Sequence, residues 1–128
     1  MATLTGSSVR ALGYQAGALF SNNDSLAELL INTGDRVSER LWRLPLWDAY
    51  KKDIESDVAD VKNFSGRPVA GAISAAKFLE SFINEHQNWA HLDIAGVAFG
   101  NSPFSTQKSA TAFGVNLLVE FLRKVVKQ

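Results

Sequence analysis

His91 and Asp93 are the residues whose types and spacing could most directly do chemistry. They lie at i and i+2, so in an extended strand both side chains face the same side. Such a pair could supply two metal ligands, or the carboxylate could orient the imidazole. A zinc site needs at least a third protein ligand and nucleophilic catalysis needs a serine or cysteine, and the neighbouring sequence supplies neither. We therefore predict a pair that hydrogen-bonds inside the fold, and a solvated His86 in a polar turn.

Four carboxylates between residues 53 and 60 begin like a calcium-binding loop: Asp53, Glu55, Asp57 and Asp60. That loop requires a glycine at its sixth position and a bidentate glutamate at its twelfth, where this sequence has Val58 and Phe64. A solvated helix end explains the charges better. The glycine-rich motifs that hold nucleotide phosphates are absent from the sequence, so nucleotide binding is not indicated.

The elements that would position these residues alternate between short apolar runs and amphipathic stretches, which favours an α/β fold. Residues 89–95 are predicted as a strand, with Ala90, Leu92 and Ile94 on one face and Trp89, His91 and Asp93 on the other. Helical spacing of apolar residues predicts helices over 25–37, 47–58, 72–83 and 115–126. Ser25 and Glu28 form an S-x-x-E capping box for the first helix, and residues 100–109 are predicted as a polar loop.

Residues 1–128 fit one domain, for which we expect part of a mixed sheet flanked by helices, with about three strands and four helices. Residues 1–4 are already strand-like, and no earlier residues form a cap or a neighbouring element. A strand that starts there should leave an open sheet edge, so we expect self-association.

Composition excludes several function classes. Thirteen Lys and Arg balance thirteen Asp and Glu, and the basic residues are scattered, which argues against a nucleic-acid partner. The sequence has neither a signal-peptide pattern nor an apolar run long enough to span a membrane. The absence of cysteine excludes disulfides and suits a reducing, cytoplasmic location.

Six sequence blocks carry a specific family resemblance. In order they are ATLTG at 2–6, LWRLPLW at 41–47, SDVADVKN at 56–63, GAISAAKFL at 71–79, WAHLDIAG at 89–96 and GVNLLVEFL at 114–122. Their order and spacing resemble the carboxy-terminal part of the catalytic domain of leucyl aminopeptidases (cytosol aminopeptidases). Together the blocks extend over nearly the whole chain.

The resemblance implies a metalloexopeptidase that removes amino-terminal residues from peptides with two divalent metal ions, Mn or Zn. Family members are cytoplasmic hexamers, and a metal-bridging water becomes their nucleophile because the cations lower its pKa. Their metal ligands lie upstream, including the segment NTDAEGRL, which this sequence does not contain. We therefore expect no catalytic residue, no metal ligand and no bound metal in this chain alone, which should be inactive.

The resemblance also implies two groups of substrate-binding residues. The first group lies at a strand end and offers backbone hydrogen bonds to the substrate: Thr3, Leu4 and Gly6. The second group surrounds the amino-terminal side chain of the substrate: Phe64, Ala95 and Ala98. This sequence departs from the family pattern in one turn, where Ala112 stands in place of the usual glycine.

Two functions remain open from the sequence. The chain could be a fragment of a two-metal leucyl aminopeptidase that contributes substrate-pocket residues. Alternatively, it could be a free-standing, non-enzymatic binding or assembly module derived from that domain, which docks onto a full-length relative.

Overall fold

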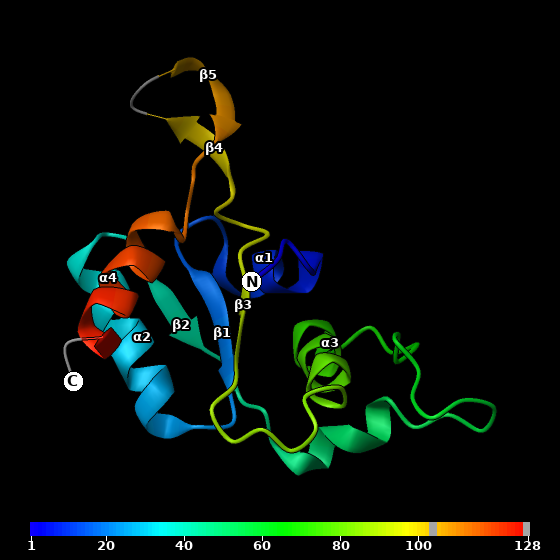
Figure 1. Ribbon diagram of the computed structural model, residues 1–128. Helices are drawn as coiled ribbons and strands as arrows, with labels where there is room; N and C mark the ends of the chain where they lie inside the picture. The colour runs from blue at the N-terminus through cyan, green and yellow to red at the C-terminus, as the bar shows by residue number, and fades with distance from the viewer. Residues whose placement is uncertain (103–104, 127–128) are drawn as a thin grey trace.

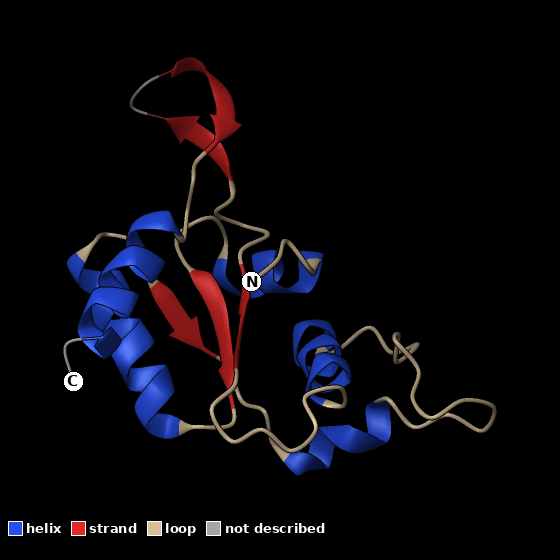
Figure 2. Ribbon diagram, in the orientation of Figure 1, coloured by secondary structure: helices blue, strands red, loops and turns tan. Residues whose placement is uncertain are grey.

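A computed structural model describes residues 1–102 and 105–126 (Figure 1). A three-stranded sheet, in the order β2-β1-β3, lies between two layers of helices (Figure 2). The strands are β1 (Gly17–Ser21), β2 (Leu41–Arg43) and β3 (Ala90–Asp93). β1 runs parallel to β2 and antiparallel to β3, which confirms the prediction of an α/β fold with a mixed sheet flanked by helices.

Each face of the sheet is covered by a pair of helices. On one side lie α2 (Asp24–Arg36) and α4 (Val115–Val126), and on the other lie α1 (Gly6–Leu12) and α3 (Gly71–Glu80) (Figure 1). A short 3-10 helix, η1 (Asp48–Asp53), packs against α3. The central strand β1 is buried along its whole length because both faces pack against helices.

The two faces of β1 belong to two apolar cores. Leu19 packs with the α2 and α4 side, in a cluster that also contains Leu92 and Leu117. Phe20 packs with the α3 side, in a cluster with Ala76. Adjacent residues of a strand point to opposite faces, so one short strand supports both cores.

The predicted helices are confirmed in part. The helix predicted over 25–37 is α2, but its N-cap is Asn23, whose side-chain oxygen accepts the backbone N–H of Leu26 at 2.9 Å. The Ser25 capping box is therefore wrong: the chain is still extended at Asn23, and Ser25 is already inside the helix. The helix predicted over 47–58 is also wrong, because only η1 forms there.

The strand predicted over 89–95 is confirmed as β3, and its alternation is correct because Ala90, Leu92 and Ile94 all pack in the α2 and α4 cluster. The strand expected at residues 1–4 is wrong in extent. Ala2 alone forms an isolated parallel bridge, to Asp93.

The polar loop predicted over 100–109 is wrong for residues 100–102 and 105–109, which lie in two paired strands, while residues 103 and 104 lie outside the described residues. β4 (Phe99–Ser102) and β5 (Ser105–Ala110) pair with each other in an antiparallel ribbon that projects from the body of the protein (Figure 1). A projecting ribbon buries little, so its sequence lacks the apolar alternation that marks a half-buried strand. The three-stranded sheet and the four α-helices confirm the expected three strands and four helices, and the described residues add the two strands of this ribbon and the short η1.

Candidate substrate-pocket segments

The Asp93 carboxylate joins the start of the chain to the end of β3. It is 1% exposed and accepts four hydrogen bonds from two segments. Oδ1 accepts the N–H of Leu4 at 3.0 Å and of Ala95 at 3.2 Å. Oδ2 accepts the N–H of Thr5 at 3.1 Å and its hydroxyl at 2.6 Å. Such donors are what a buried carboxylate needs, and they hold the two segments against each other.

The segment at residues 3–6 leads directly into α1. Thr5 is the N-cap, and its side-chain oxygen accepts the N–H of Ser8 at 3.1 Å. The Ser8 hydroxyl in turn donates to the Thr5 carbonyl at 2.8 Å. Gly6 is exposed, and a Cβ at this position would meet no atom within 4 Å. Space is therefore open beside the backbone of this segment.

The segment after β3 forms a tight turn. The Ile94 carbonyl accepts the N–H groups of both Val97 and Ala98, at 3.0 and 2.9 Å. Ala95 and Ala98 are both half-buried. Because Ala95 and Leu4 share the Asp93 carboxylate, the structure brings these two sequence-predicted residues together.

Phe64 lies elsewhere. Its side chain is 74% exposed, in the long connection between η1 and α3. This connection extends away from the end of the sheet where the N-terminus lies (Figure 1). The structure therefore does not place Phe64 beside Leu4 and Ala95, and its role in the substrate pocket stays a prediction.

His91 is buried beside Asp93 but does not complete a hydrogen-bonded pair. It is 4% exposed, and its ring stacks on Phe20 and Trp89 with centroid distances of 5.9 and 6.4 Å. Its Nε2 finds no hydrogen-bond partner among the described residues, so the predicted internal bonding is confirmed for Asp93 and wrong for this nitrogen. Burial lowers the pKa of His91, the Met1 ammonium lowers it further, and Asp93 opposes both. His91 is accordingly neutral at neutral pH.

The described residues contain no group of three or more His, Asp or Glu side chains that could hold a metal ion. The run of carboxylates after η1 is exposed at Glu55, Asp57 and Asp60, as expected. Asp53 is the exception, because it is 7% exposed and bonds the Arg67 guanidinium at 2.8 Å. The prediction that these carboxylates are solvated is therefore wrong for Asp53, which forms an ion pair.

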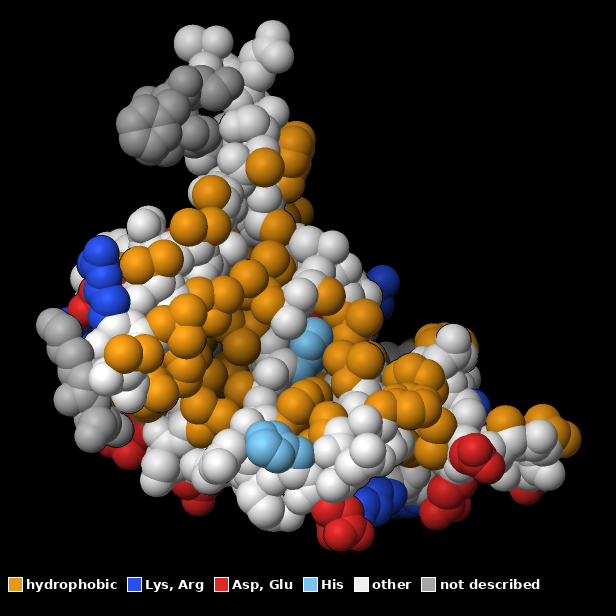
Figure 3. Space-filling view, viewed as in Figure 1, with side chains coloured by type: hydrophobic (Ala, Val, Ile, Leu, Met, Phe, Trp, Pro, Cys, Tyr) orange, Lys and Arg blue, Asp and Glu red, His pale blue; other side chains and the backbone are white. Residues whose placement is uncertain are grey.

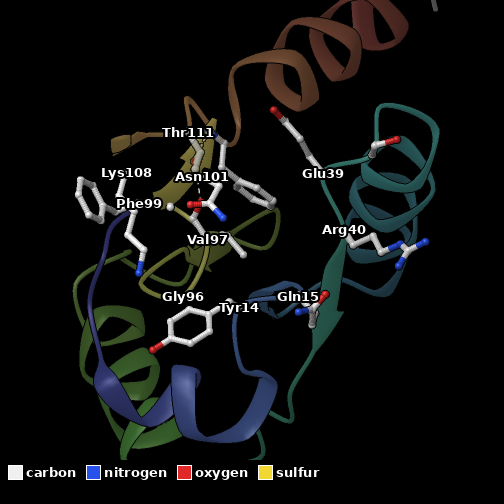
Figure 4. Close-up of a pocket in the computed structure, with 13 residues that line it drawn as sticks. Tyr14, Gln15, Glu39, Arg40, Gly96, Val97, Phe99, Asn101, Lys108 and Thr111 are labelled. Atoms are coloured by element: carbon white, nitrogen blue, oxygen red, sulfur yellow. Dashed lines mark hydrogen bonds between the residues drawn. The ribbon is translucent and has the colours of Figure 1, made fainter. Parts of the chain in front are cut away.

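A hollow of about 770 Å³ lies between the base of the hairpin and the body (Figure 4). The Thr111 hydroxyl donates to the Val97 carbonyl at 2.6 Å and ties the two ends of the hairpin together. On the opposite wall Glu39 points toward α4, where it accepts the N–H of Leu117 at 2.8 Å. The sequence did not indicate this hollow, because its lining comes from loops and from the strands β4 and β5, which only the fold brings together.

No helix within residues 1–102 and 105–126 is long and apolar enough to cross a membrane.

The chain is similar to known proteins over almost its whole length. Residues 1–119 match the model of the cytosol aminopeptidase family, catalytic domain. The probable cytosol aminopeptidase of Chloroherpeton thalassium is 55% identical over 123 residues, which are 96% of this chain and 24% of that protein. The probable cytosol aminopeptidase of Chlorobaculum parvum is 54% identical, with the same coverage.

Solved structures of other proteins are also similar to this chain. The bottromycin maturation enzyme BotP in complex with Mn matches with a TM-score of 0.87 and 39% identity, over 96% of this chain and 27% of BotP. A mutant of tomato leucine aminopeptidase matches with a TM-score of 0.86 and 38% identity, over 95% of this chain and 23% of the other. The chain thus spans about a quarter of the length of the relatives it matches.

Proposed function

Because this chain belongs to the cytosol aminopeptidase family, as part of its catalytic domain, we propose that it forms the substrate-pocket portion of a leucyl aminopeptidase. The assembled enzyme removes amino-terminal residues from peptides. The observation that carries the proposal is the Asp93 carboxylate, which fixes the backbone at Leu4 and Thr5 against Ala95. Two segments that the family resemblance assigns to one pocket are therefore neighbours.

In this proposal the chain binds and orients the substrate. The backbone of Thr3, Leu4 and Gly6 offers hydrogen bonds, and the open space beside Gly6 lets a ligand approach closely. The small side chains of Ala95 and Ala98 leave room for a leucine-like group, and Phe64 closes the cavity if the long connection folds over it in the assembled enzyme.

The described residues do not fit a two-metal site, since they offer no cluster of ligands. By the family resemblance, two divalent ions, Mn or Zn, would be held by ligands of the segment upstream of the matched quarter. The relative BotP is described in complex with Mn. Substrate positioning is the part of the chemistry that this chain's own residues perform.

The relatives are named cytosol aminopeptidases, which supports a cytoplasmic location. A homo-oligomer, hexameric as in the family, is part of the same proposal.

A chimera tests the proposed function. This chain replaces the matching quarter of the Chloroherpeton thalassium protein, and hydrolysis of leucine and alanine anilides is measured with added manganese. We expect an active chimera in which Ala95→Leu raises KM for the leucine substrate much more than for the alanine substrate, because the larger side chain fills the cavity. Ala59→Leu, at an exposed site, is the matched control. An active chimera in which Ala95→Leu changes KM equally for the leucine and alanine substrates would contradict the assignment of Ala95 to the substrate pocket.

A further inference from the structure

The connection between η1 and α3 carries three exposed apolar side chains. Val58, Phe64 and Val69 are 94%, 74% and 55% exposed. Figure 3 shows hydrophobic side chains among charged ones at the lower right, on the part of the molecule that this connection forms. A loop side chain can select a ligand only if the rest of the fold holds the loop in place. The contacts that hold Phe64 therefore decide whether it can act in the pocket.

Two contacts lie on either side of Phe64. Before it, the backbone N–H of Lys62 donates to the Ile54 carbonyl at 2.8 Å. After it, the Arg67 guanidinium bonds the Asp53 carboxylate, also at 2.8 Å. Both contacts reach consecutive residues at the end of η1. The two ends of a short loop are thus fixed at one place, with Phe64 between them.

The chain between Phe64 and Arg67 turns tightly. The Ser65 hydroxyl accepts the backbone N–H of Arg67 at 3.2 Å. Gly66 has φ of 74°, in the left-handed region that glycine adopts without steric cost. Because the turn connects the two residues closely, fixing the Arg67 side chain also restricts where Phe64 can lie.

The ion pair is asymmetric in burial. Asp53 is 7% exposed, and a buried carboxylate needs a hydrogen-bond donor or a cation. The side chain of Arg67 is 55% exposed, so it would be solvated without its partner. Asp53 would instead be left buried and uncompensated if Arg67 moved away, which is costly. The pair therefore favours the loop in its closed position.

η1, which carries Asp53, is itself fixed to α3. Lys77 of α3 is 2% exposed, and its Nζ bonds Asp48 of η1 at 3.2 Å and Glu80 at 2.6 Å. Hydrogen bonds from Lys51 and Lys77 lower the pKa of Asp48, so this carboxylate is charged at neutral pH. The position of Asp53 is thus set by the body of the protein, through α3 and η1.

We propose that Asp53 and Arg67 are positioning residues, whose ion pair fixes the loop that presents Phe64 and so makes the pocket select large apolar amino-terminal side chains. This inference rests on the proposed function, which assigns Phe64 to the pocket. The ion pair acts only through Phe64 and touches no reacting atom. Its loss should therefore weaken the binding of a leucine side chain more than that of an alanine side chain, and leave turnover nearly unchanged.

Kinetics of the chimera described above test the selection. Arg67→Gln should raise KM for the leucine anilide about threefold or more, with KM for the alanine anilide and both kcat values within about twofold of the parent. Phe64→Ala should shift the preference in the same direction. Adding Arg67→Gln to Phe64→Ala should have no further effect, because the ion pair acts through Phe64. Arg36→Gln, which breaks an ion pair with Glu120 on the other side of the sheet, is the matched control and should behave like the parent.

Cleavage by chymotrypsin tests the anchoring without any activity. Release of the fragment that ends at Phe64 is followed by mass spectrometry on this chain. Arg67→Gln should speed this release about threefold or more, because the loop opens more often. Arg67→Lys keeps a cation that can pair with Asp53 and should restore much of the protection.

A second variant covers the case in which Arg67→Gln does not fold, as judged by circular dichroism. Asp53→Leu fills the buried position with an apolar side chain and leaves Arg67 in solvent, so the fold is kept while the ion pair is lost. It should speed cleavage after Phe64 as Arg67→Gln does.

Three outcomes overturn the inference. A folded variant without the ion pair is cleaved after Phe64 like the parent, or it keeps the parent's preference for leucine over alanine, or it shifts that preference equally when Phe64→Ala is already present. If Ala95→Leu still shifts the preference, each of these outcomes leaves the proposed function standing. An inactive chimera contradicts the proposed function instead. Faster cleavage in Arg67→Gln that Arg67→Lys reverses then still supports the anchoring of Phe64.

Discussion

The Asp93 carboxylate and the Thr5 hydroxyl, 88 positions apart in sequence, are joined by a hydrogen bond of 2.6 Å. The same Thr5 side chain caps α1 through the N–H of Ser8. One contact thus links the end of β3 to the start of the first helix, and the two predicted halves of the substrate pocket depend on it.

Asp93→Ala should lower the free energy of unfolding by about 1 to 3 kcal/mol, because it leaves the partly buried N–H donors of Leu4, Thr5 and Ala95 without an acceptor. Thermal and urea unfolding measure the loss. Asp60→Ala, at an exposed carboxylate, should unfold like the parent. An Asp93→Ala variant as stable as the Asp60 control would show that the network contributes nothing to stability.

Ala112→Gly should stabilise the chain by about 0.5 to 1 kcal/mol. Ala112 has φ of 58°, in the left-handed region that costs an L side chain roughly 1 to 2 kcal/mol. Glycine removes that cost but also increases the entropy of the unfolded chain, so the net gain is smaller. Urea unfolding measures it, with Ala59→Gly, which has no positive φ, expected to be neutral or destabilising. A less stable Ala112→Gly variant would contradict the prediction.

Stability should fall as the pH drops below about 6.5, in part because of His91. Its folded pKa is lowered by burial, so the unfolded chain takes up a proton first and is favoured in acid. Conversely, the contribution of the neutral ring is fully present above the unfolded pKa. Urea unfolding at pH 7.5 and 5.5 should show a smaller loss for His91→Gln than for the parent. His86→Gln, at an exposed site, should keep the parent's loss.

The purified chain alone should neither cleave leucine anilides nor retain stoichiometric manganese or zinc, because the described residues form no cluster of ligands. Activity assays and elemental analysis of the same preparation test this. Activity that survives purification and disappears with a chelator would point to ligands such as His91 and Asp93.

The chain alone should self-associate in dilute solution, because the outer edge of β3 and the apolar face of α4 are exposed. Light scattering at several concentrations and binding of a hydrophobic dye measure this. A monodisperse monomer that binds no dye would contradict the prediction and favour an independent small domain.

The sequence predicted the elements whose burial pattern is strong. α2, α3 and α4 each bury one face, and β3 places Leu92 in one core while His91, on its other face, stacks on Phe20, so their periods are visible in the sequence. β1 and β2 were missed because β1 is buried on both faces and β2 is only three residues long, so neither alternates.

The candidate site was predictable only through the family blocks. Residue types at Leu4, Ala95 and Ala98 are ordinary for packing, and no spacing rule joins residue 4 to residue 95. The Asp93 network that joins them is a product of the fold. Asp93 itself was predicted as a bonded structural residue, but the donors it binds could not be read from a strand pattern.

The sheet order also determines when each strand can pair if the chain folds during its synthesis. β1 and β2 are close in sequence and can pair early, with α2 between them. The other side of β1 must wait for β3, which leaves the ribosome last of the three. Until then the fully buried strand Gly17–Ser21 has one side unprotected. This interval is when the nascent chain is most open to chaperones and to wrong strand partners.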